Sequence, residues 1–275
     1  MKERVVRYMS RWFVLGNPSR PIKPFTVNLL YWKPSTGDNV GDLLSLIIYK
    51  QMLKTGGGVK HPFSVKTRRV VAIGSVLSFV GSGKTTVWGT GLMNEKCVEV
   101  LPIKNAKLDV RAVRGPKTRK CLIKAGYICP EVYGDPAILL PVFYNPTVST
   151  IKGKVVIIPH HSRFEKYASR FDNVLDTYTS DWRKFVLEIK SAEKVISSSL
   201  HGIILAESYG IPCVWLNDIP DSPFKYEDYY QSSGRDTYPL ANDIEEAMTM
   251  QGEINPCFNK MQKDLMDCFP YDLFD

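Results

Sequence analysis

Short runs rich in β-branched residues alternate with longer amphipathic segments from residue 26 onward. This alternation is typical of βα units that assemble into parallel sheets. In the first half of the chain the pattern predicts strands at Thr26–Trp32, Arg69–Ile73, Thr86–Trp88, Val110–Val113 and Glu131–Tyr133. It predicts helices between them at Asp42–Leu53 and Pro116–Ala125.

A second series follows Leu139–Gly153, a stretch with proline and glycine that is the predicted linker. Its strands are expected at Val155–Pro159, Lys194–Ser197 and Pro212–Leu216, and its helices at Asp181–Ser191, Leu200–Tyr209, Asp243–Met250 and Lys260–Phe269. We therefore expect an α/β protein whose two Rossmann-like domains, residues 26–145 and residues 146–275 with closing C-terminal helices, face each other across a cleft. Such sheets bind ligands at the carboxyl ends of their strands.

Residues 1–25 form a separate basic segment. Its charged residues up to Pro24 are six basic ones and one acidic one: Lys2, Arg4, Arg7, Arg11, Arg20, Lys23 and Glu3. A helix over residues 2–14 would place three arginines on one face and apolar or aromatic side chains on another. That arrangement is typical of a helix lying in an anionic membrane interface, with contact through residues 1–15. An extension that frays or packs on the domain explains the segment equally well.

Composition and charge narrow the function classes. The chain has 275 residues, 44% hydrophobic and 23% charged, which fits a globular protein of about two domains. The net charge is +8, but +5 of it lies in the first 24 residues, so the remainder is too weakly basic for a nucleic-acid groove. No apolar run is long enough to span a membrane and no signal peptide is evident, so we expect a cytoplasmic protein. The six cysteines form no Cys-x-x-Cys pair, which disfavours zinc ribbons and disulfide frameworks.

One glycine-rich stretch imitates a phosphate-binding loop. Gly81–Thr86 resembles the end of a P-loop, but Ser78 stands where that motif needs glycine. The residues after Lys84 also follow a strand pattern, whereas a P-loop is followed at once by a helix. We therefore predict a turn before a buried strand.

The strongest candidate site is the junction of strand and helix at Lys194–Gly202. Serines such as Ser198 and Ser199 suit the start of the predicted helix, whose free N–H groups and positive dipole end attract anions. Leu200 and His201 lie in its first turn, where the imidazole would bond a phosphate or move a proton. The competing explanation is a histidine that only helps to cap the helix.

A second candidate anion site lies at Arg114. A short strand delivers this arginine to its carboxyl end, and Pro116 suits the first position of the next helix. Lys117 follows one turn along. A guanidinium in this place matches a carboxylate or phosphate in bidentate fashion. A solvated basic helix face is the plainer explanation, and it suffices for Arg119 and Lys120.

Two further polar groups follow predicted strands. In Thr36–Asp42, Asp42 is expected to be the N-cap of the next helix, although Asn39 and Asp42 would equally suit sugar hydroxyls or a general base. His160 and His161 follow the first strand of the second series. Neighbours on a strand point to opposite faces, so at most one of the two is expected to line a shared site. No ligand set for a metal accompanies them.

These stretches together resemble the polysaccharide pyruvyl transferase family. The matching features are Asn39-x-Gly-Asp42, Trp88–Gly91, Arg114 before a helix, Gly134–Ala137, and Ser199–Gly202 with Gly210–Pro212. They occur in the expected order over about residues 26–217, and it is their succession that is specific. The departure is Thr118, where many relatives are expected to carry serine.

The resemblance implies a GT-B-like arrangement of the two domains, with phosphoenolpyruvate as donor and a sugar as acceptor. The product would be a cyclic pyruvate ketal on two hydroxyls of one sugar. The implied donor site comprises Arg114, Lys117, Ser198, Ser199, Leu200 and His201, and the implied acceptor site Asn39, Asp42, His160 and His161. His201 would be the general acid or phosphate ligand, Asp42 the base and Arg114 the donor anchor. No metal and no cofactor is expected, since phosphoenolpyruvate is a co-substrate.

The acceptor and the chemistry leave alternatives. A sugar linked to polyprenyl pyrophosphate would give the basic segment a purpose, namely peripheral contact with the inner membrane face, whereas a soluble glycan acceptor would not. A GT-B glycosyltransferase that uses a nucleotide sugar would share the fold. A non-catalytic glycan-binding protein is the alternative from another class.

Overall fold

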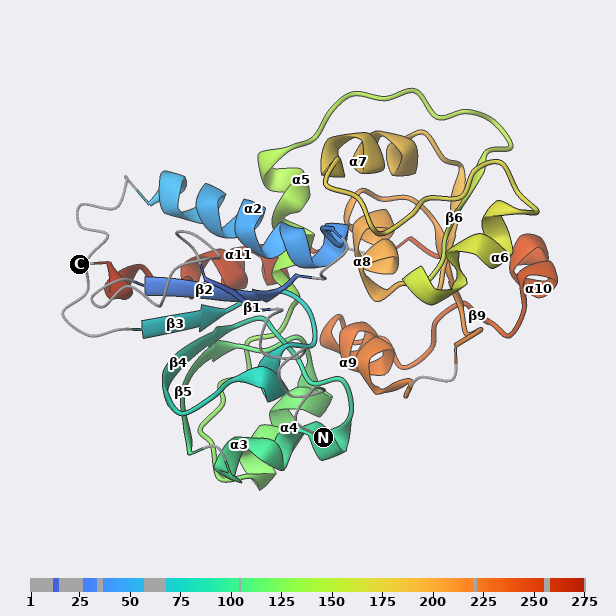
Figure 1. Ribbon diagram of the computed structural model, residues 1–275. Coiled ribbons are helices and arrows are strands. Elements are labelled where there is room, and N and C mark those ends of the chain that lie inside the picture. Colours follow the sequence, from blue (N-terminus) through green and yellow to red (C-terminus); the bar gives the residue numbers. More distant parts are fainter. Residues whose placement is uncertain are drawn as a thin grey trace.

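The protein consists of two parallel sheets with their helices, lying side by side (Figure 1). The computed structural model describes residues 12–14, 27–33, 37–56, 68–103, 105–219, 222–254 and 258–274. This mixed α/β architecture with two parallel sheets agrees with the expected pair of Rossmann-like units.

The first sheet has the order β1-β2-β3-β4-β5, in which β1 is antiparallel to β2 and the other four strands are parallel. Its strands are β1 Trp12–Val14, β2 Val27–Trp32, β3 Arg68–Val71, β4 Gly83–Trp88 and β5 Ala106–Ala112. The helices of this half are α2 Val40–Thr55, η1 Leu77–Phe79, η2 Glu95–Val98, α3 Val100–Ile103, α4 Pro116–Lys124, η3 Pro136–Leu139 and α5 Leu140–Phe143.

The second sheet has the order β6-β7-β8-β9, and its neighbouring strands are all parallel. The strands are β6 Val155–Ile158, β7 Lys194–Ser197, β8 Cys213–Leu216 and β9 Leu240–Ala241. The helices that follow α5 are η4 His161–Arg163, α6 Phe164–Ala168, α7 Trp182–Lys190, α8 Leu200–Ser208, α9 Phe224–Ser232, α10 Ile244–Thr249, α11 Asn259–Asp267 and η5 Tyr271–Leu273.

The predicted elements are confirmed apart from two, and the structure adds several elements that were not predicted, most of them short. The strand expected at Glu131–Tyr133 is a single bridge between Tyr133 and Val113. The helix expected over residues 2–14 is wrong at Trp12–Val14, because these residues pair with β2 as a strand, and its other residues lie outside the described part. The longest of the unpredicted helices is α9, Phe224–Ser232. Gly81–Thr86 leads into β4 as a turn and strand, as expected.

The chain returns to the first sheet after completing the second. The indole Nε1 of Trp88 in β4 donates a hydrogen bond of 2.8 Å to the carbonyl of Leu265 in α11. The ring of Phe269 stands edge-on to Trp88, with centroids 4.8 Å apart. The core of the first half therefore includes residues 258–274, while the domain boundaries 26–145 and 146–275 stay a prediction.

Helix α9 contacts both halves of the molecule. On one side Tyr226 stacks on Trp215 of β8 at a centroid distance of 4.3 Å. On the other side Asp228 accepts hydrogen bonds from the backbone N–H and the hydroxyl of Thr118 in α4, at 2.9 and 2.7 Å. The same carboxylate pairs with Arg114, and both side chains are fully buried. This helix therefore fixes the two sheets relative to each other.

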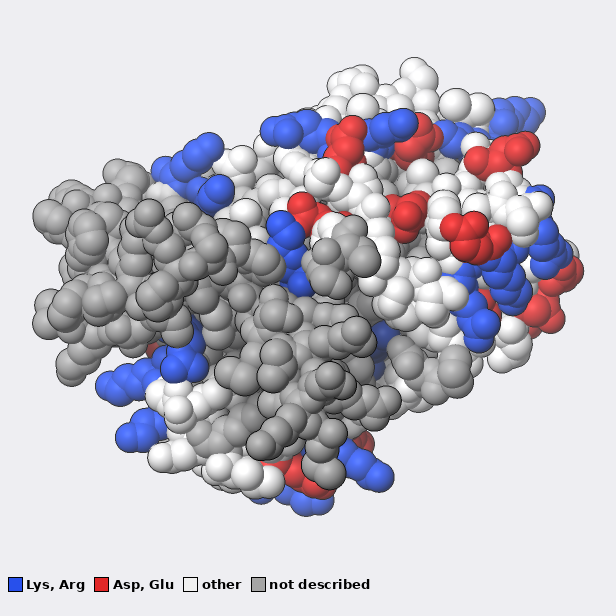
Figure 2. All heavy atoms as spheres, viewed as in Figure 1, with Lys and Arg blue, Asp and Glu red and all other residues white. Residues whose placement is uncertain are grey.

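Charges of both signs alternate over the described surface of the second half on the face shown in Figure 2. Its ion pairs include Arg170 with Glu245 and Lys154 with Glu188, each 2.7 Å. A nucleic-acid groove requires a stripe of one sign, which the described part of this face does not present. No described helix combines the length and the apolar composition that a membrane crossing requires.

The contact between α4 and α9 predicts the effect of a small substitution. A Cβ atom at Gly115 would lie 1.8 Å from the carbonyl oxygen of Asp228, which is too close for any rearrangement of a side chain to relieve. We expect Gly115→Ala to lower the free energy of unfolding by about 1–3 kcal/mol. Urea titration measures this. The matched variant Gly81→Ala is expected to be near neutral, because its Cβ would meet, among the described residues, just Arg69 at 3.5 Å. Equal effects of the two variants would contradict the tight contact.

Candidate functional site

A cavity of about 250 Å³ lies where the carboxyl ends of strands from both sheets meet. Its walls are the start of α2, the loop after β3, the ends of β6 and β7, and the start of α9. The polar residues that line it include Asn39, Asp42, Ser75, His160, His161, Ser199, His201 and Lys225. The cavity thus joins both predicted parts of the site, which lie far apart in the sequence.

The start of α2 brings Asp42 into the cavity. Asn39 is the N-cap of this helix, since its side chain accepts a hydrogen bond of 3.1 Å from the N–H of Gly41. The prediction that Asp42 is the N-cap is therefore wrong, because Asn39 already fills that role. The neighbouring N–H of Val40 donates to the carbonyl of Thr177 in the other half at 2.8 Å. Asp42 remains available for chemistry.

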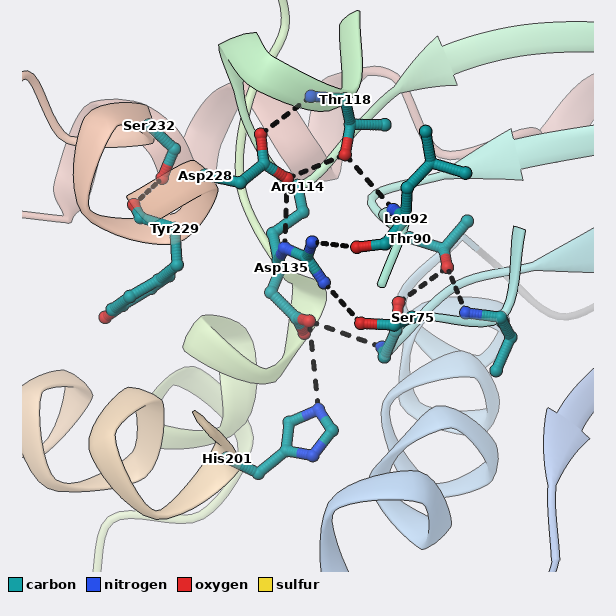
Figure 3. A network of polar contacts seen from close by, with 12 residues as sticks. Ser75, Thr90, Leu92, Arg114, Thr118, Asp135, His201, Asp228, Tyr229 and Ser232 are labelled. Atoms are coloured by element: carbon teal, nitrogen blue, oxygen red, sulfur yellow. Dashed lines mark hydrogen bonds and ion pairs between the residues drawn. The ribbon is translucent and has the colours of Figure 1, made fainter. Parts of the chain in front are cut away.

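His201 lies in the first turn of α8, packed against the start of α2. A Cβ atom at Gly41 would lie 2.0 Å from its Nδ1, so only glycine leaves room for the imidazole. The Nε2 atom is buried, finds no hydrogen-bond partner among the described residues and lies 3.8 Å from Oδ2 of Asp135 (Figure 3). Asp135 is fully buried and accepts hydrogen bonds from the N–H groups of Ala137 and Gly74. An acidic partner therefore faces the predicted general acid.

Burial raises the pKa of Asp42 to about 7 from its ordinary value of 3.8. The neighbouring His201 lowers this pKa and the Asp135 carboxylate raises it, but loss of hydration is the largest cause. Asp42 and His201 both approach Gly74, at 3.2 and 3.7 Å from the position of a Cβ there. A carboxylate that titrates near neutral pH is well suited to accept a proton and return it.

The serines before α8 have different tasks. Ser198 is fully buried, and its hydroxyl accepts a hydrogen bond of 3.0 Å from the N–H of His160. Ser199 is the N-cap residue as predicted, yet its side chain makes no capping bond. Ser199 and Leu200 line the cavity beside His201. The first residues of α8 therefore border the cavity, whereas Ser198, also predicted for the site, is not among the lining residues.

Both adjacent histidines line the cavity, so the prediction that at most one does is wrong. The strand β6 ends at Ile158, and His160 caps the short helix η4 that begins at His161. The alternation of a strand no longer applies there. The centroids of the two imidazole rings lie 4.0 Å apart. The ring of His161 also stacks on that of Tyr178, with centroids 5.0 Å apart.

Arg114 begins the turn into α4 as predicted, but it does not line the cavity. Its side chain is fully buried and donates to Asp228 at 3.0 Å, to the Ser75 hydroxyl at 2.7 Å and to the Leu92 carbonyl. Lys117 forms an ion pair with Glu227 and is likewise absent from the lining. This geometry does not support direct contact between a ligand in the cavity and either of the two side chains.

Several residues at or beside the cavity were not among the predicted site residues, and Asp135, Ser75 and Lys225 are the ones with a role in the arguments below. Asp135 belongs to Gly134–Ala137, a stretch that carried the family resemblance without a role, so the sequence held a signal for it. Ser75 and Lys225 carried none. Lys225 lies on α9 with only 9% of its surface exposed. Among the described residues, no cluster of three His, Cys, Asp or Glu side chains could hold a metal ion.

Comparison with known families shows the family of this chain. The family model "Polysaccharide pyruvyl transferase" matches residues 39–218, more than half of the chain. The chain belongs to the polysaccharide pyruvyl transferase family. Of the residues that line the cavity, Trp32 and Lys225 lie outside the range that matches the family.

A relative from Acanthamoeba polyphaga mimivirus, described as an uncharacterized protein, is 33% identical over 187 residues. The match covers 60% of this chain and 61% of the relative. The chain therefore spans less than two thirds of that relative's length. Membership of the polysaccharide pyruvyl transferase family is carried by the family model.

The raised pKa of Asp42 predicts a pH-dependent difference in stability. Because the folded pKa of about 7 exceeds the unfolded value of 3.8, the contribution of Asp42 to stability is complete below about pH 4 and is lost as the pH rises to about 7. The variant Asp42→Asn cannot titrate. We expect it to become more stable relative to wild type between pH 4 and pH 8, by at most about 4 kcal/mol. Urea unfolding at several pH values measures this, with the exposed carboxylate variant Asp172→Asn as control. A difference that is constant with pH would contradict the assignment.

Proposed function

We propose that this protein transfers the pyruvyl group of phosphoenolpyruvate onto two hydroxyls of one sugar, releasing phosphate. The acceptor belongs to a bacterial-type surface polysaccharide or to its lipid-linked precursor. The observation that carries the proposal is the meeting of His201 and Asp42 in one small cavity between the two sheets, with the buried Asp135 3.8 Å from the imidazole of His201. Family membership supports the same reaction class.

The size of the cavity favours a small donor. Pockets for drug-sized ligands measure about 300–1,000 Å³. The present cavity of about 250 Å³ lies below that range, as expected for a compact donor that carries a phosphate and a carboxylate. A nucleotide sugar needs additional room for its base and ribose. This argues for pyruvyl transfer over a glycosyltransferase, the principal alternative.

The two halves are proposed to face each other in the manner of GT-B enzymes. In this arrangement the second half binds the donor at the start of α8, where the helix N–H groups, Ser199 and His201 meet anionic oxygens. Lys225 of α9 supplies a cationic side chain on the same wall. The first half holds the acceptor through Asn39 and Asp42, with His160 and His161 opposite.

The proposed reaction begins with protonation of the donor's methylene carbon by His201, which creates cationic character at C2. A sugar hydroxyl forms a bond to C2 while Asp42 accepts its proton. The bond between C2 and the phosphate oxygen then breaks, and phosphate leaves with the proton from Asp42. The second hydroxyl attacks C2 and returns its proton to His201. No metal or cofactor takes part in this proposal.

The acceptor and the location of the enzyme stay proposals as well. A polyprenyl-linked acceptor would be met at the inner membrane face, with residues 1–15 as the contact. Of these residues only Trp12–Val14 are described, and they form a strand. We propose a cytoplasmic enzyme, with peripheral contact at the inner membrane face if its acceptor is lipid-linked.

The proposal predicts that phosphoenolpyruvate binds and that His201 acts on it. We expect this ligand to raise the thermal unfolding midpoint of the wild-type protein, because it binds only the folded state. With a panel of sugar acceptors, we expect phosphate release that falls by about 100-fold or more in His201→Gln. Ser208→Ala, a variant at the far end of α8, controls for disturbance of the helix. Stabilisation by a nucleotide sugar and none by phosphoenolpyruvate would overturn the proposal.

A further inference from the structure

The side chain of Ser75 separates the buried Arg114 from the cavity. Ser75 lies in the loop after β3 and lines the cavity. Its hydroxyl oxygen accepts a hydrogen bond of 2.7 Å from Nη1 of Arg114 (Figure 3). The guanidinium of Arg114 does not line the cavity itself, but it is hydrogen-bonded to a side chain that does.

The loop that carries Ser75 is held on both sides. The N–H of Gly74 donates to Asp135, and its carbonyl accepts from the Thr90 hydroxyl at 2.7 Å and from the N–H of Gly91 at 3.0 Å. The N–H of Val76 donates back to the Thr90 hydroxyl at 3.3 Å. Gly74 has a φ of +89°, a conformation that favours glycine. Ser75 therefore cannot move far from Arg114.

The guanidinium is equally fixed. Its Nε donates to Asp228 on the side away from Ser75, and its Nη2 donates to the Leu92 carbonyl. A Cβ atom at Gly91 would lie 2.5 Å from Cζ, so the backbone there closes on the face of the guanidinium. Arg114 therefore presents one Nη1 donor to Ser75 in a set direction.

The chemistry of the two groups decides where the hydroxyl proton points. An arginine has donors only, whereas a serine hydroxyl has one donor and two acceptor lone pairs. Since Arg114 uses a lone pair of Ser75, the Ser75 proton must point away from the guanidinium. The structure records no acceptor for that proton among the described residues. The adjacent charge also polarises the O–H bond and strengthens it as a donor.

We propose that Ser75 donates this hydrogen bond to an anionic oxygen of the donor substrate, a carboxylate or phosphate oxygen. Arg114 then acts as a positioning residue that aims and polarises the hydroxyl without touching the ligand. The inference rests on the proposed function and deepens it. In this proposal Arg114 acts on the ligand through the Ser75 hydroxyl and does not bind the ligand directly.

The test compares ligand affinities of the purified full chain by calorimetry. We expect Ser75→Ala to weaken phosphoenolpyruvate binding by about tenfold or more, since hydrogen bonds to charged groups are among the stronger ones. Ser208 lies outside the site, and within the described part of the chain its hydroxyl donates to the Leu205 carbonyl at 3.0 Å. We expect Ser208→Ala to leave the affinity unchanged. Inorganic phosphate and pyruvate serve as separate probes, and the one whose affinity falls in Ser75→Ala identifies the oxygen.

A double-mutant cycle distinguishes this relay, the action of Arg114 on the ligand through the Ser75 hydroxyl, from a general disturbance of the loop. Arg114→Lys removes the Nη1 donor that bonds Ser75. We expect this substitution to weaken phosphoenolpyruvate binding less in the Ser75→Ala protein than in the wild-type protein. Thermal unfolding checks that each variant is folded, and a folded Ser75→Ala protein suffices for the test if Arg114→Lys does not fold. If phosphoenolpyruvate binds the wild-type protein and Ser75→Ala with the same affinity, the relay is wrong but the proposed function stands. Absence of wild-type binding to phosphoenolpyruvate would overturn the proposed function itself.

Discussion

The ion pair between Arg114 and Asp228 is the contact on which the arrangement of the two halves depends. Both side chains are fully buried; Arg114 lies just before α4 of the first half, and Asp228 lies in α9, which follows β8 of the second sheet. Removing one partner of such a pair leaves an uncompensated buried charge, which typically costs about 3–5 kcal/mol. The extra hydrogen bonds from Thr118 satisfy the carboxylate and give the pair a defined geometry. The pair therefore specifies how α9 sits on α4.

The cavity is a product of that arrangement. The imidazole of His201 belongs to the second half, but its seat on Gly41 and its acidic neighbour Asp135 belong to the first. The hydrogen bond from the N–H of Val40 to the carbonyl of Thr177 also joins the two halves beside the cavity. The groups that we propose as acid, base and anion site therefore come from both halves.

The periodicity of the chain was sufficient to predict the sheets. The family resemblance implied that Asn39, Asp42 and His201 belong to one site, and the structure places all three on the wall of one cavity. Helix α9 could not be predicted in this way. A surface helix has one apolar stripe, but α9 buries Lys225 and Asp228 together with aromatic residues, so that contrast is missing. The burial of Arg114 was hidden for a related reason, since its partner lies 114 positions further along the chain. Local sequence cannot indicate a contact at that distance.

The return of α11 to the first sheet has a consequence for folding. Trp88 finds its hydrogen-bond acceptor at Leu265 and its aromatic neighbour at Phe269, both beyond the second sheet. During synthesis, the first sheet emerges long before these residues do, so its core stays open while the second sheet forms. The half that is made first is therefore the half that is completed last, and the nascent chain exposes apolar surface around Trp88 until residues 258–274 arrive.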